Sequence, residues 1–168
     1  MEREGEEGKA GGFLSDGRSD PRPELLRRLR SSLREQGSIV AYNASFEKTI
    51  LEQSTAAYPE YASWWRAQEH RLVDLYAPFR SFDYYHPSQL GSTSIKAVLP
   101  ALTGASYAGL SIGDGAAASR EFARITFGDV EEKERVAVRR ELERYCATDT
   151  AAMRDIVAAL RSIVREGG

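Results

Sequence analysis

The last third of the chain carries the pattern that most constrains the fold. Apolar or aromatic side chains recur every three or four residues between about residues 130 and 165, which is the period of one helix face. The stripe consists of Val138, Leu142, Tyr145, Asp149, Met153, Ile156, Leu160 and Ile163. The spacing therefore predicts a long C-terminal helix, with a kink allowed, that packs one face against the rest of the molecule.

Asp149 is the one charged residue in this stripe. A carboxylate that faces a core is costly unless it is paired, hydrogen-bonded or bound to a metal. Three interpretations are therefore open. Asp149 binds a metal together with other carboxylates, or it caps a new helical segment with Thr150 and points to solvent, or it is a polar residue tolerated on a packing seam.

The segments before this helix alternate between helical and strand patterns. Asp20 and Pro21 suit the start of a helix, and Gly37 suits its end. Short apolar runs at 38–42 and 71–75 predict two buried strands. Further helices are predicted near 44–55, 59–69, 94–102 and 114–126, with a loop over 81–93. This order predicts an α/β fold in which a small sheet is flanked by helices.

The length of 168 residues favours one domain. Residues 1–19 are rich in glycine and charge, and we expect a disordered or weakly ordered tail there, followed by the domain at 20–166. Phe13 and Leu14 interrupt the tail and indicate either the end of a lost strand or a packed arm.

Composition bounds the function. The net charge of −2 gives no overall positive field that would attract nucleic acid. The single cysteine excludes a disulfide within the chain and disfavours a cysteine zinc site, and we expect Cys146 to pack as a small apolar group. There is no signal-peptide pattern and no apolar run of the ~20 residues that span a bilayer. We therefore expect a cytoplasmic protein without membrane contact.

Glu47 is a candidate ligand because it follows the first predicted strand, in the first turn of a helix. Sites in open α/β sheets form at the carboxyl ends of strands. Phe46 and Ile50 are expected to pack inward and fix the turn, and Asn43 to cap the helix or contact substrate. An acid in a first turn is also favoured by the helix dipole alone, so both interpretations of Glu47 are open.

Each remaining candidate residue has a structural interpretation besides the functional one. Asp74 ends the second strand and is expected to cap the next turn rather than bind metal. Lys96 follows a predicted Ser or Thr N-cap and either meets a substrate phosphate or is solvated. Tyr84, Tyr85 and His86 either stack on a terminal base or, as we prefer, are buried loop aromatics.

Taken together, these segments resemble the DEDD superfamily of 3′–5′ exonucleases, in its tyrosine (DEDDy) subclass. The superfamily's Asn-x-x-Phe-Asp motif is matched by Asn43-Ala44-Ser45-Phe46-Glu47, with Glu in place of Asp, and its Tyr-x-x-x-Asp motif by Tyr145-Cys146-Ala147-Thr148-Asp149. The strings around 42–48, 71–75, 91–100 and 145–153 look like an uncharacterised bacterial family of this superfamily. The resemblance covers roughly residues 20–165.

The resemblance implies a ribonuclease-H-like fold and two-metal hydrolysis of a phosphodiester at the 3′ end of DNA or RNA. By resemblance, Glu47 and Asp149 are metal ligands and Tyr145 orients the attacking water. Asn43 and Lys96 are then substrate-binding residues. Hard oxygen ligands imply Mg²⁺ or Mn²⁺.

The superfamily's first motif, Asp-x-Glu on an opening strand, has no counterpart here. The Asp-x-Glu at 129–131 precedes the last helix, where Asp129 and Glu132 predict a capping box. We therefore expect a partial fold with its first strands missing, impaired or inactive unless an upstream segment or partner chain completes the sheet. The alternatives are a non-catalytic remnant that binds nucleic acid or protein, and an unrelated helical scaffold with Glu47 far from Asp149.

Overall fold

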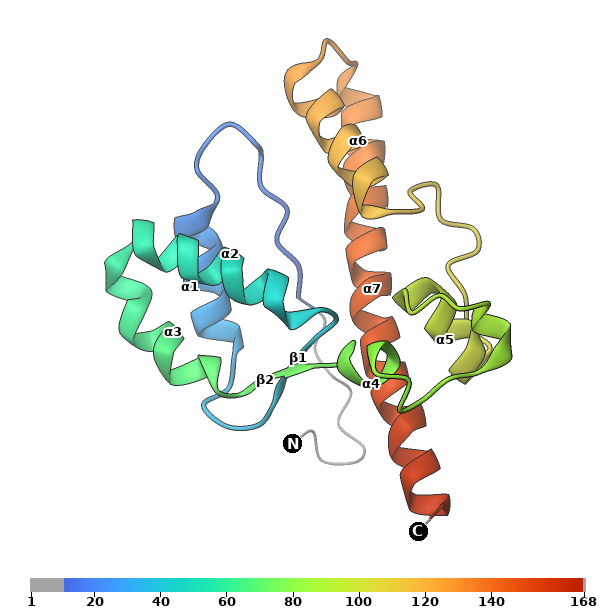
Figure 1. The fold of residues 1–168 in the computed structure, drawn as a ribbon. Helices are drawn as coiled ribbons and strands as arrows, with labels where there is room; N and C mark the ends of the chain where they lie inside the picture. The colour runs from blue at the N-terminus through green and yellow to red at the C-terminus, as the bar shows by residue number, and fades with distance from the viewer. Residues whose placement is uncertain (1–10, 168) are drawn as a thin grey trace.

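The computed structural model describes residues 11–167, which form a mixed α/β structure that is mostly helical (Figure 1). In chain order its elements are α1 (Arg22–Ser32), β1 (Ile39–Ala41), α2 (Ala44–Ala57), the 3₁₀ turn η1 (Pro59–Tyr61), α3 (Ala62–Glu69), β2 (Leu72–Asp74), α4 (Ala77–Arg80), the 3₁₀ turn η2 (Pro87–Gln89), α5 (Ile95–Thr103), α6 (Gly115–Phe127) and α7 (Glu132–Glu166). Both predicted strands and every predicted helix are confirmed, with shifted ends. The largest shift is in α1, because Leu33 is already extended, well before Gly37.

The two strands form a small parallel sheet, joined by a crossover through α2 and α3. Val40 lies opposite Val73 in the register. The ladder continues past the strands, since the Leu75 N–H donates to the Ala41 carbonyl at 2.8 Å. Both carboxyl ends therefore lie at one edge of the sheet, and the segments that follow them start there.

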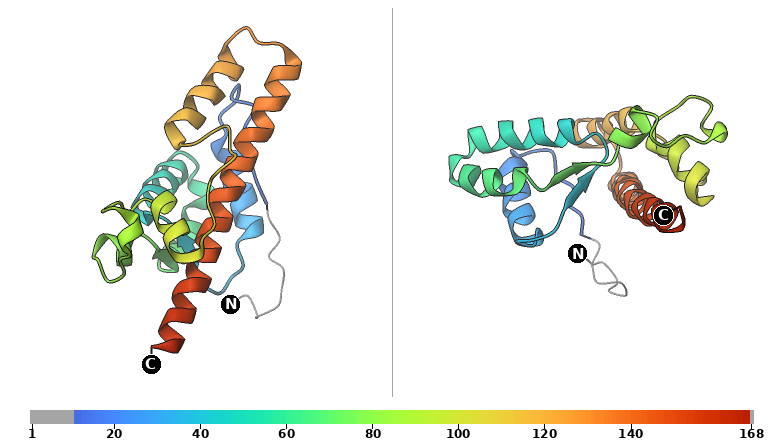
Figure 2. Two further views of the ribbon diagram at one scale, coloured as in Figure 1. Left: turned by 90° about the vertical axis from the view of Figure 1, so that its right-hand side faces the viewer. Right: turned by 60° about the horizontal axis from the view of Figure 1, so that its bottom comes forward.

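Two separate hydrophobic cores pack against the long helix α7 (Figure 1). The first, here called the sheet-side core, is built on Leu75, Phe79, Val98, Leu99, Ala152 and Ile156. The second, here called the hairpin core, is built on Ile112, Ile125, Leu142 and Tyr145. Two views show α6 beside the N-terminal part of α7, and α5 beside a more C-terminal part (Figures 1 and 2).

The predicted stripe of α7 faces these cores as far as Leu160, whereas Ile163 is exposed. Three local expectations about this helix were wrong. Asp149 does not cap a new segment, because α7 runs without interruption through it. Asp129 and Glu132 do not form a capping box, since Glu131 is the N-cap and no side chain caps the helix. Cys146, predicted to pack, is exposed because it lies off the stripe.

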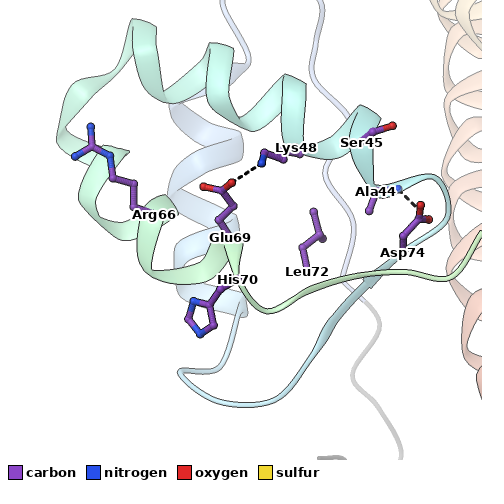
Figure 3. Close-up of a pocket in the computed structure, with 8 residues that line it drawn as sticks. All are labelled: Ala44, Ser45, Lys48, Arg66, Glu69, His70, Leu72 and Asp74. Atoms are coloured by element: carbon purple, nitrogen blue, oxygen red, sulfur yellow. Dashed lines mark hydrogen bonds and ion pairs between the residues drawn. The ribbon is translucent and has the colours of Figure 1, made fainter. Parts of the chain in front are cut away.

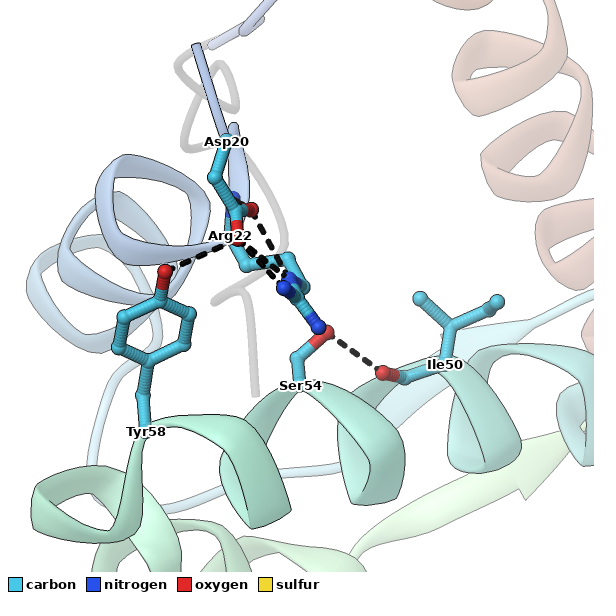
Figure 4. Close-up of polar contacts among 5 residues, drawn as sticks. All are labelled: Asp20, Arg22, Ile50, Ser54 and Tyr58. Atoms are coloured by element: carbon cyan, nitrogen blue, oxygen red, sulfur yellow. Dashed lines mark hydrogen bonds and ion pairs between the residues drawn. The ribbon is translucent and has the colours of Figure 1, made fainter.

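Helices α1, α2 and α3 gather on the other side of the strands (Figure 2), with Leu26 and Trp65 buried. Asp20, the predicted start of α1, accepts the Arg22 backbone N–H at 3.0 Å. It also accepts the Tyr58 hydroxyl at 2.9 Å (Figure 4). Nearby, the buried Ser54 hydroxyl donates to the Ile50 carbonyl at 2.7 Å (Figure 4). These contacts tie the start of α1 to the end of α2.

Residues 11–19 belong to the predicted tail and cross toward α6 and α7. Leu14 packs on the hairpin core, and the Arg139 guanidinium donates to the Leu14 and Ser15 carbonyls at 2.8 Å each. Gly17 has φ +74°, and a Cβ there would lie 2.5 Å from Thr126 Cγ2, so the close approach requires glycine. Of the two interpretations of Phe13 and Leu14, the packed arm agrees with these contacts. Residues 1–10 lie outside the described residues.

Even α7, with 35 residues, has no stretch apolar enough to cross a membrane, and neither has any other helix of residues 11–167.

Candidate active site

Asp74 organises the carboxyl edge of the sheet. Its Oδ1 accepts the backbone N–H groups of Asn43 at 3.0 Å, Ala44 at 3.2 Å and Tyr76 at 3.0 Å. The last bond caps the turn after β2, as predicted, and the first two cap α2 from across the sheet. Because one oxygen of Asp74 holds three backbone donors, the residue has a structural role at this edge.

Asn43 does not cap α2 with its side chain, contrary to one expectation. It adopts a left-handed conformation, with φ 67° and ψ 60°, which is uncommon for a residue with a Cβ. The backbone bonds to Asp74 hold it there, and its own Oδ1 accepts the Ser45 hydroxyl at 2.9 Å. A strained residue at the end of a strand is a frequent property of binding sites.

Glu47 lies on the inner face of α2. This face carries Ala44, Ser54 and Thr55, which are all buried, and Glu47 shares it at helical spacing. The Glu47 Oε2 atom is buried and has no hydrogen-bond partner. Burial raises the pKa of the Glu47 carboxyl, and the nearby charge of Asp74 raises it further.

Phe46 and Ile50 were predicted to pack inward, and this is wrong, since they are 63% and 38% exposed. The two residues are four apart and share a face. That face points away from α1 and the sheet because Ala44, Ser54 and Thr55 occupy the inner one.

Asp149 lies at the boundary between the two cores, with Tyr145 of the hairpin core one turn before it and Ala152 of the sheet-side core after it. Its Oδ1 is buried and has no hydrogen-bond partner. Tyr107, from the loop between α5 and α6, lies close to it, and its hydroxyl is also buried without a well-formed hydrogen bond. Burial and then the neighbouring Asp149 raise the pKa of Tyr107, and the same two causes raise the pKa of Tyr145 to about 12.

Lys96 connects the two tyrosines. Its Nζ lies 5.7 Å from the ring centroid of Tyr107 and 5.3 Å from that of Tyr145, within cation–π range. The same Nζ donates to the Gly113 carbonyl. The predicted N-cap before it is confirmed, because the Ser94 hydroxyl accepts the Lys96 N–H. The amine therefore contacts the protein at a partly exposed position.

The start of α2 is linked to the sheet-side core through the residue that precedes Asn43. Tyr42, immediately before Asn43, packs on the sheet-side core and contributes to the raised pKa of Tyr107. The start of α2 points toward the middle of α7 (Figure 1). Within residues 11–167, no three His, Cys, Asp or Glu side chains are grouped so that they could hold a metal. The described chain therefore offers at most the two predicted carboxylates.

Three of the candidate-site residues have a buried side-chain atom that lacks a hydrogen-bond partner. In the described part of the chain there are four: Glu47 Oε2, Trp65 Nε1, Tyr107 Oη and Asp149 Oδ1. Both carboxylate oxygens among them belong to the two predicted metal ligands. Buried polar groups are nearly always satisfied, so such groups call for a bound atom such as an ion or water.

Two hollows flank the start of α2. One, of about 410 Å³, is lined by Ala44, Ser45, Lys48, Arg66, Glu69, His70, Leu72 and Asp74 (Figure 3). There the ammonium of Lys48 pairs with Glu69 at 2.5 Å. The other, of about 380 Å³, is lined by Tyr42, Asn43, Tyr76, Thr93, Ser94 and Ile95. Asn43, a predicted substrate residue, thus borders a hollow.

The three neighbouring ring residues of the loop, Tyr84, Tyr85 and His86, lie in different environments. Tyr84 packs edge-on against Phe79 with ring centroids 6.0 Å apart, as expected for a buried loop residue. Tyr85 is 43% exposed, and its hydroxyl accepts the Gly91 N–H at 3.2 Å. His86 Nδ1 accepts the Ser88 N–H at 3.3 Å and caps η2. The preferred interpretation therefore holds for Tyr84 and was wrong for Tyr85 and His86.

Comparison with known proteins identifies a family. The sequence profile of a domain of unknown function, DUF2779, matches residues 1–94. The chain belongs to this family, because the match covers more than half of its length. A search of curated proteins and a search of solved structures found no significant match.

Proposed function

We propose that this chain is a ribonuclease-H-like 3′–5′ exonuclease-type domain of the DEDDy class. Glu47 and Asp149 are its metal ligands, and Tyr145 orients the attacking water. One observation carries the proposal. The two carboxylates chosen from the sequence each have a buried oxygen without a hydrogen-bond partner, so each has lone pairs available to a cation.

The donor set fits a hard divalent cation. Carboxylate oxygens suit Mg²⁺ or Mn²⁺, which keep several waters when few protein ligands are available. A bound cation would activate a water and stabilise the leaving oxygen of a phosphodiester. Tyr145, with its pKa raised to about 12, stays protonated at neutral pH. Its hydroxyl therefore orients a water by hydrogen bonding and does not act as a base.

The superfamily's reaction uses four carboxylates, and we propose that the other two come from an upstream segment or a partner chain. The free edge of β1 supports this. The Ile39 N–H donates to the Arg71 carbonyl just before β2. The Ala41 carbonyl accepts from the Leu75 N–H just after β2, so the polar groups of Val40, between them, face outward. An added strand would pair there. The chain alone is then impaired or inactive, and its substrate in the complete form is a DNA or RNA 3′ end.

A non-catalytic interaction domain is the second candidate, and a separate observation favours it. Phe46 and Ile50 are 63% and 38% exposed and lie four residues apart on one face of α2. Large exposed apolar side chains near one another are typical of contact surfaces. In this alternative Glu47 and Asp149 hold no cation, and the chain binds nucleic acid or protein without cleaving.

Cation binding distinguishes the two candidates. We expect millimolar Mn²⁺ to broaden the ring NMR signals of Tyr107 and Tyr145 in the wild type. Asp149→Asn and Glu47→Gln should each weaken this binding at least ~10-fold, since even supporting residues of metal sites contribute that much. Asp155→Asn is the matched control on the same helix, because Asp155 pairs with Arg154. Equal broadening in the wild type and Asp149→Asn would refute the metal site.

Activity is the second measurement. A 5′-labelled single-stranded oligonucleotide with Mn²⁺ should give a ladder of shortened products, weak for this chain alone and absent for Asp149→Asn. Equal degradation by both proteins would point to a contaminating nuclease and count against catalysis by this chain.

A further inference from the structure

The loop between α5 and α6 brings to Asp149 a residue that neither the sequence motifs nor the family assigns. Tyr107 lies in a segment rich in Gly and Ser, at 104–113, and packs on the sheet-side core. Its hydroxyl and the Asp149 Oδ1 atom are both buried and both lack a well-formed hydrogen bond. A phenol donates and a carboxylate only accepts, so the two groups are chemically complementary.

We propose that Tyr107 is a positioning residue whose hydroxyl donates a hydrogen bond to one lone pair of Asp149 Oδ1. The bond fixes how the carboxylate is turned and leaves the second lone pair of the same oxygen for a cation. The bond itself concerns this chain alone. Its effect on a bound cation rests on the function proposed above.

Lys96 helps to hold the loop that carries Tyr107 beside Asp149 on α7. It contacts one ring from each core, Tyr107 of the sheet-side core and Tyr145 of the hairpin core. Its bond to the Gly113 carbonyl anchors the end of the loop that carries Tyr107. The loop tyrosine is thereby held against α7 by a charge as well as by packing.

The two tyrosines then have different tasks. Tyr145 lies on α7 itself, one turn before Asp149, and is the residue that orients water in the proposed reaction. Tyr107 approaches from a loop and acts on the carboxylate. A hydrogen bond from a neutral donor to a carboxylate is charge-assisted and strong in a buried setting. Removing it should free the carboxylate to rotate and so weaken its hold on a cation.

Tyr107→Phe tests this, because it keeps the ring under Lys96 and removes only the hydroxyl. We expect the affinity for Mn²⁺ to fall about 10-fold. Tyr84→Phe is the matched control, because it removes the hydroxyl of another tyrosine that packs on the sheet-side core and should leave the affinity within about twofold. Thermal unfolding of both variants reports whether the fold is kept.

A second readout needs no metal. A buried hydroxyl bonded to a carboxylate gives a slowly exchanging, downfield proton signal in NMR. We expect this signal in the wild type, its loss in Tyr107→Phe and an upfield shift in Asp149→Asn. A Tyr107 signal that Asp149→Asn leaves unchanged would overturn the proposal, as would unchanged Mn²⁺ affinity in Tyr107→Phe. If the wild type binds no Mn²⁺, the proposed function fails, and the hydroxyl signal still decides whether Tyr107 holds Asp149.

Discussion

The two cores along α7 differ in what they connect. The sheet-side core joins segments far apart in the chain, since Leu75 and Phe79 after β2 pack with Ala152 and Ile156. The hairpin core is more local, because Ile112 and Ile125 pack with Leu142 in the N-terminal third of α7. Leu14 joins it from the segment before α1. The first core therefore holds the overall fold, and the second holds one helical hairpin.

Asp149 lies between the two cores and belongs to neither. Tyr145 belongs to one core and Ala152 to the other, and the carboxylate between them keeps an oxygen without a partner. A packed helix face that is interrupted by a charged residue at the junction of two cores loses stability there. Asp149 therefore lies at the junction of the two cores, here called the seam. Disrupting the sheet-side core should disturb Asp149 by unfolding the whole domain, and disrupting the hairpin core should disturb it by loosening one helical hairpin.

The largest effect is expected from the sheet-side core. Phe79 is fully buried, and its ring packs against Tyr42 and Tyr84 at 6.2 Å and 6.0 Å between centroids. Phe79→Ala should lower the free energy of unfolding by roughly 3–5 kcal/mol, measured by urea denaturation. Phe82→Ala, three residues on and 62% exposed, is the control and should change it by no more than about 0.5 kcal/mol. Similar values for the two variants would mean that this core does not hold the fold.

A smaller and more local effect is expected from the hairpin core. Ile125 is 1% exposed, and Ile125→Ala should cost roughly 2–4 kcal/mol. We expect amide hydrogen exchange to speed up in α6 and the N-terminal half of α7, while α5 keeps its protection. Phe127→Ala, on the same helix with 78% exposure, is the control. Uniform loosening of all of α7 would show that the two cores unfold as one.

Local patterns in the sequence were sufficient to predict the helices, the strands and the position of Asp149 in the candidate site. The spacing of the α7 stripe places Asp149 on a buried face, and the apolar runs before Asn43 and after His70 give both strands. These features depend on periodicity within a few residues, which a single sequence displays directly.

Partners distant in the sequence were the part that could not be predicted. The N-terminus of α2 is capped by Asp74, about thirty residues later, and not by the adjacent Asn43. Which face of α2 turns inward depends on α1 and the sheet, so the sequence alone led to the wrong prediction that Phe46 and Ile50 pack inward. Tyr107 carried only a weak signal, a single aromatic residue in a Gly-rich and Ser-rich loop, since nothing local indicates that Lys96 and Asp149 approach it.

The smallest effect concerns Glu47, in the first turn of α2. Its pKa is raised above the ordinary value of 4.5 by burial and by Asp74. Between the two values the folded protein binds more protons than the unfolded chain, so stability falls as the pH rises through this interval. Glu47→Gln cannot ionise and should lose this decline, which urea denaturation across a pH series would detect as a difference from the wild type.

Glu52→Gln is the matched control for that series, because Glu52 lies on the exposed face of α2 and pairs with Lys48 at 3.9 Å. We expect its profile to run parallel to that of the wild type. A Glu47→Gln profile that is also parallel would mean that water reaches the Glu47 carboxyl freely. The proposed metal site would then lose the desolvated second ligand on which the proposal depends.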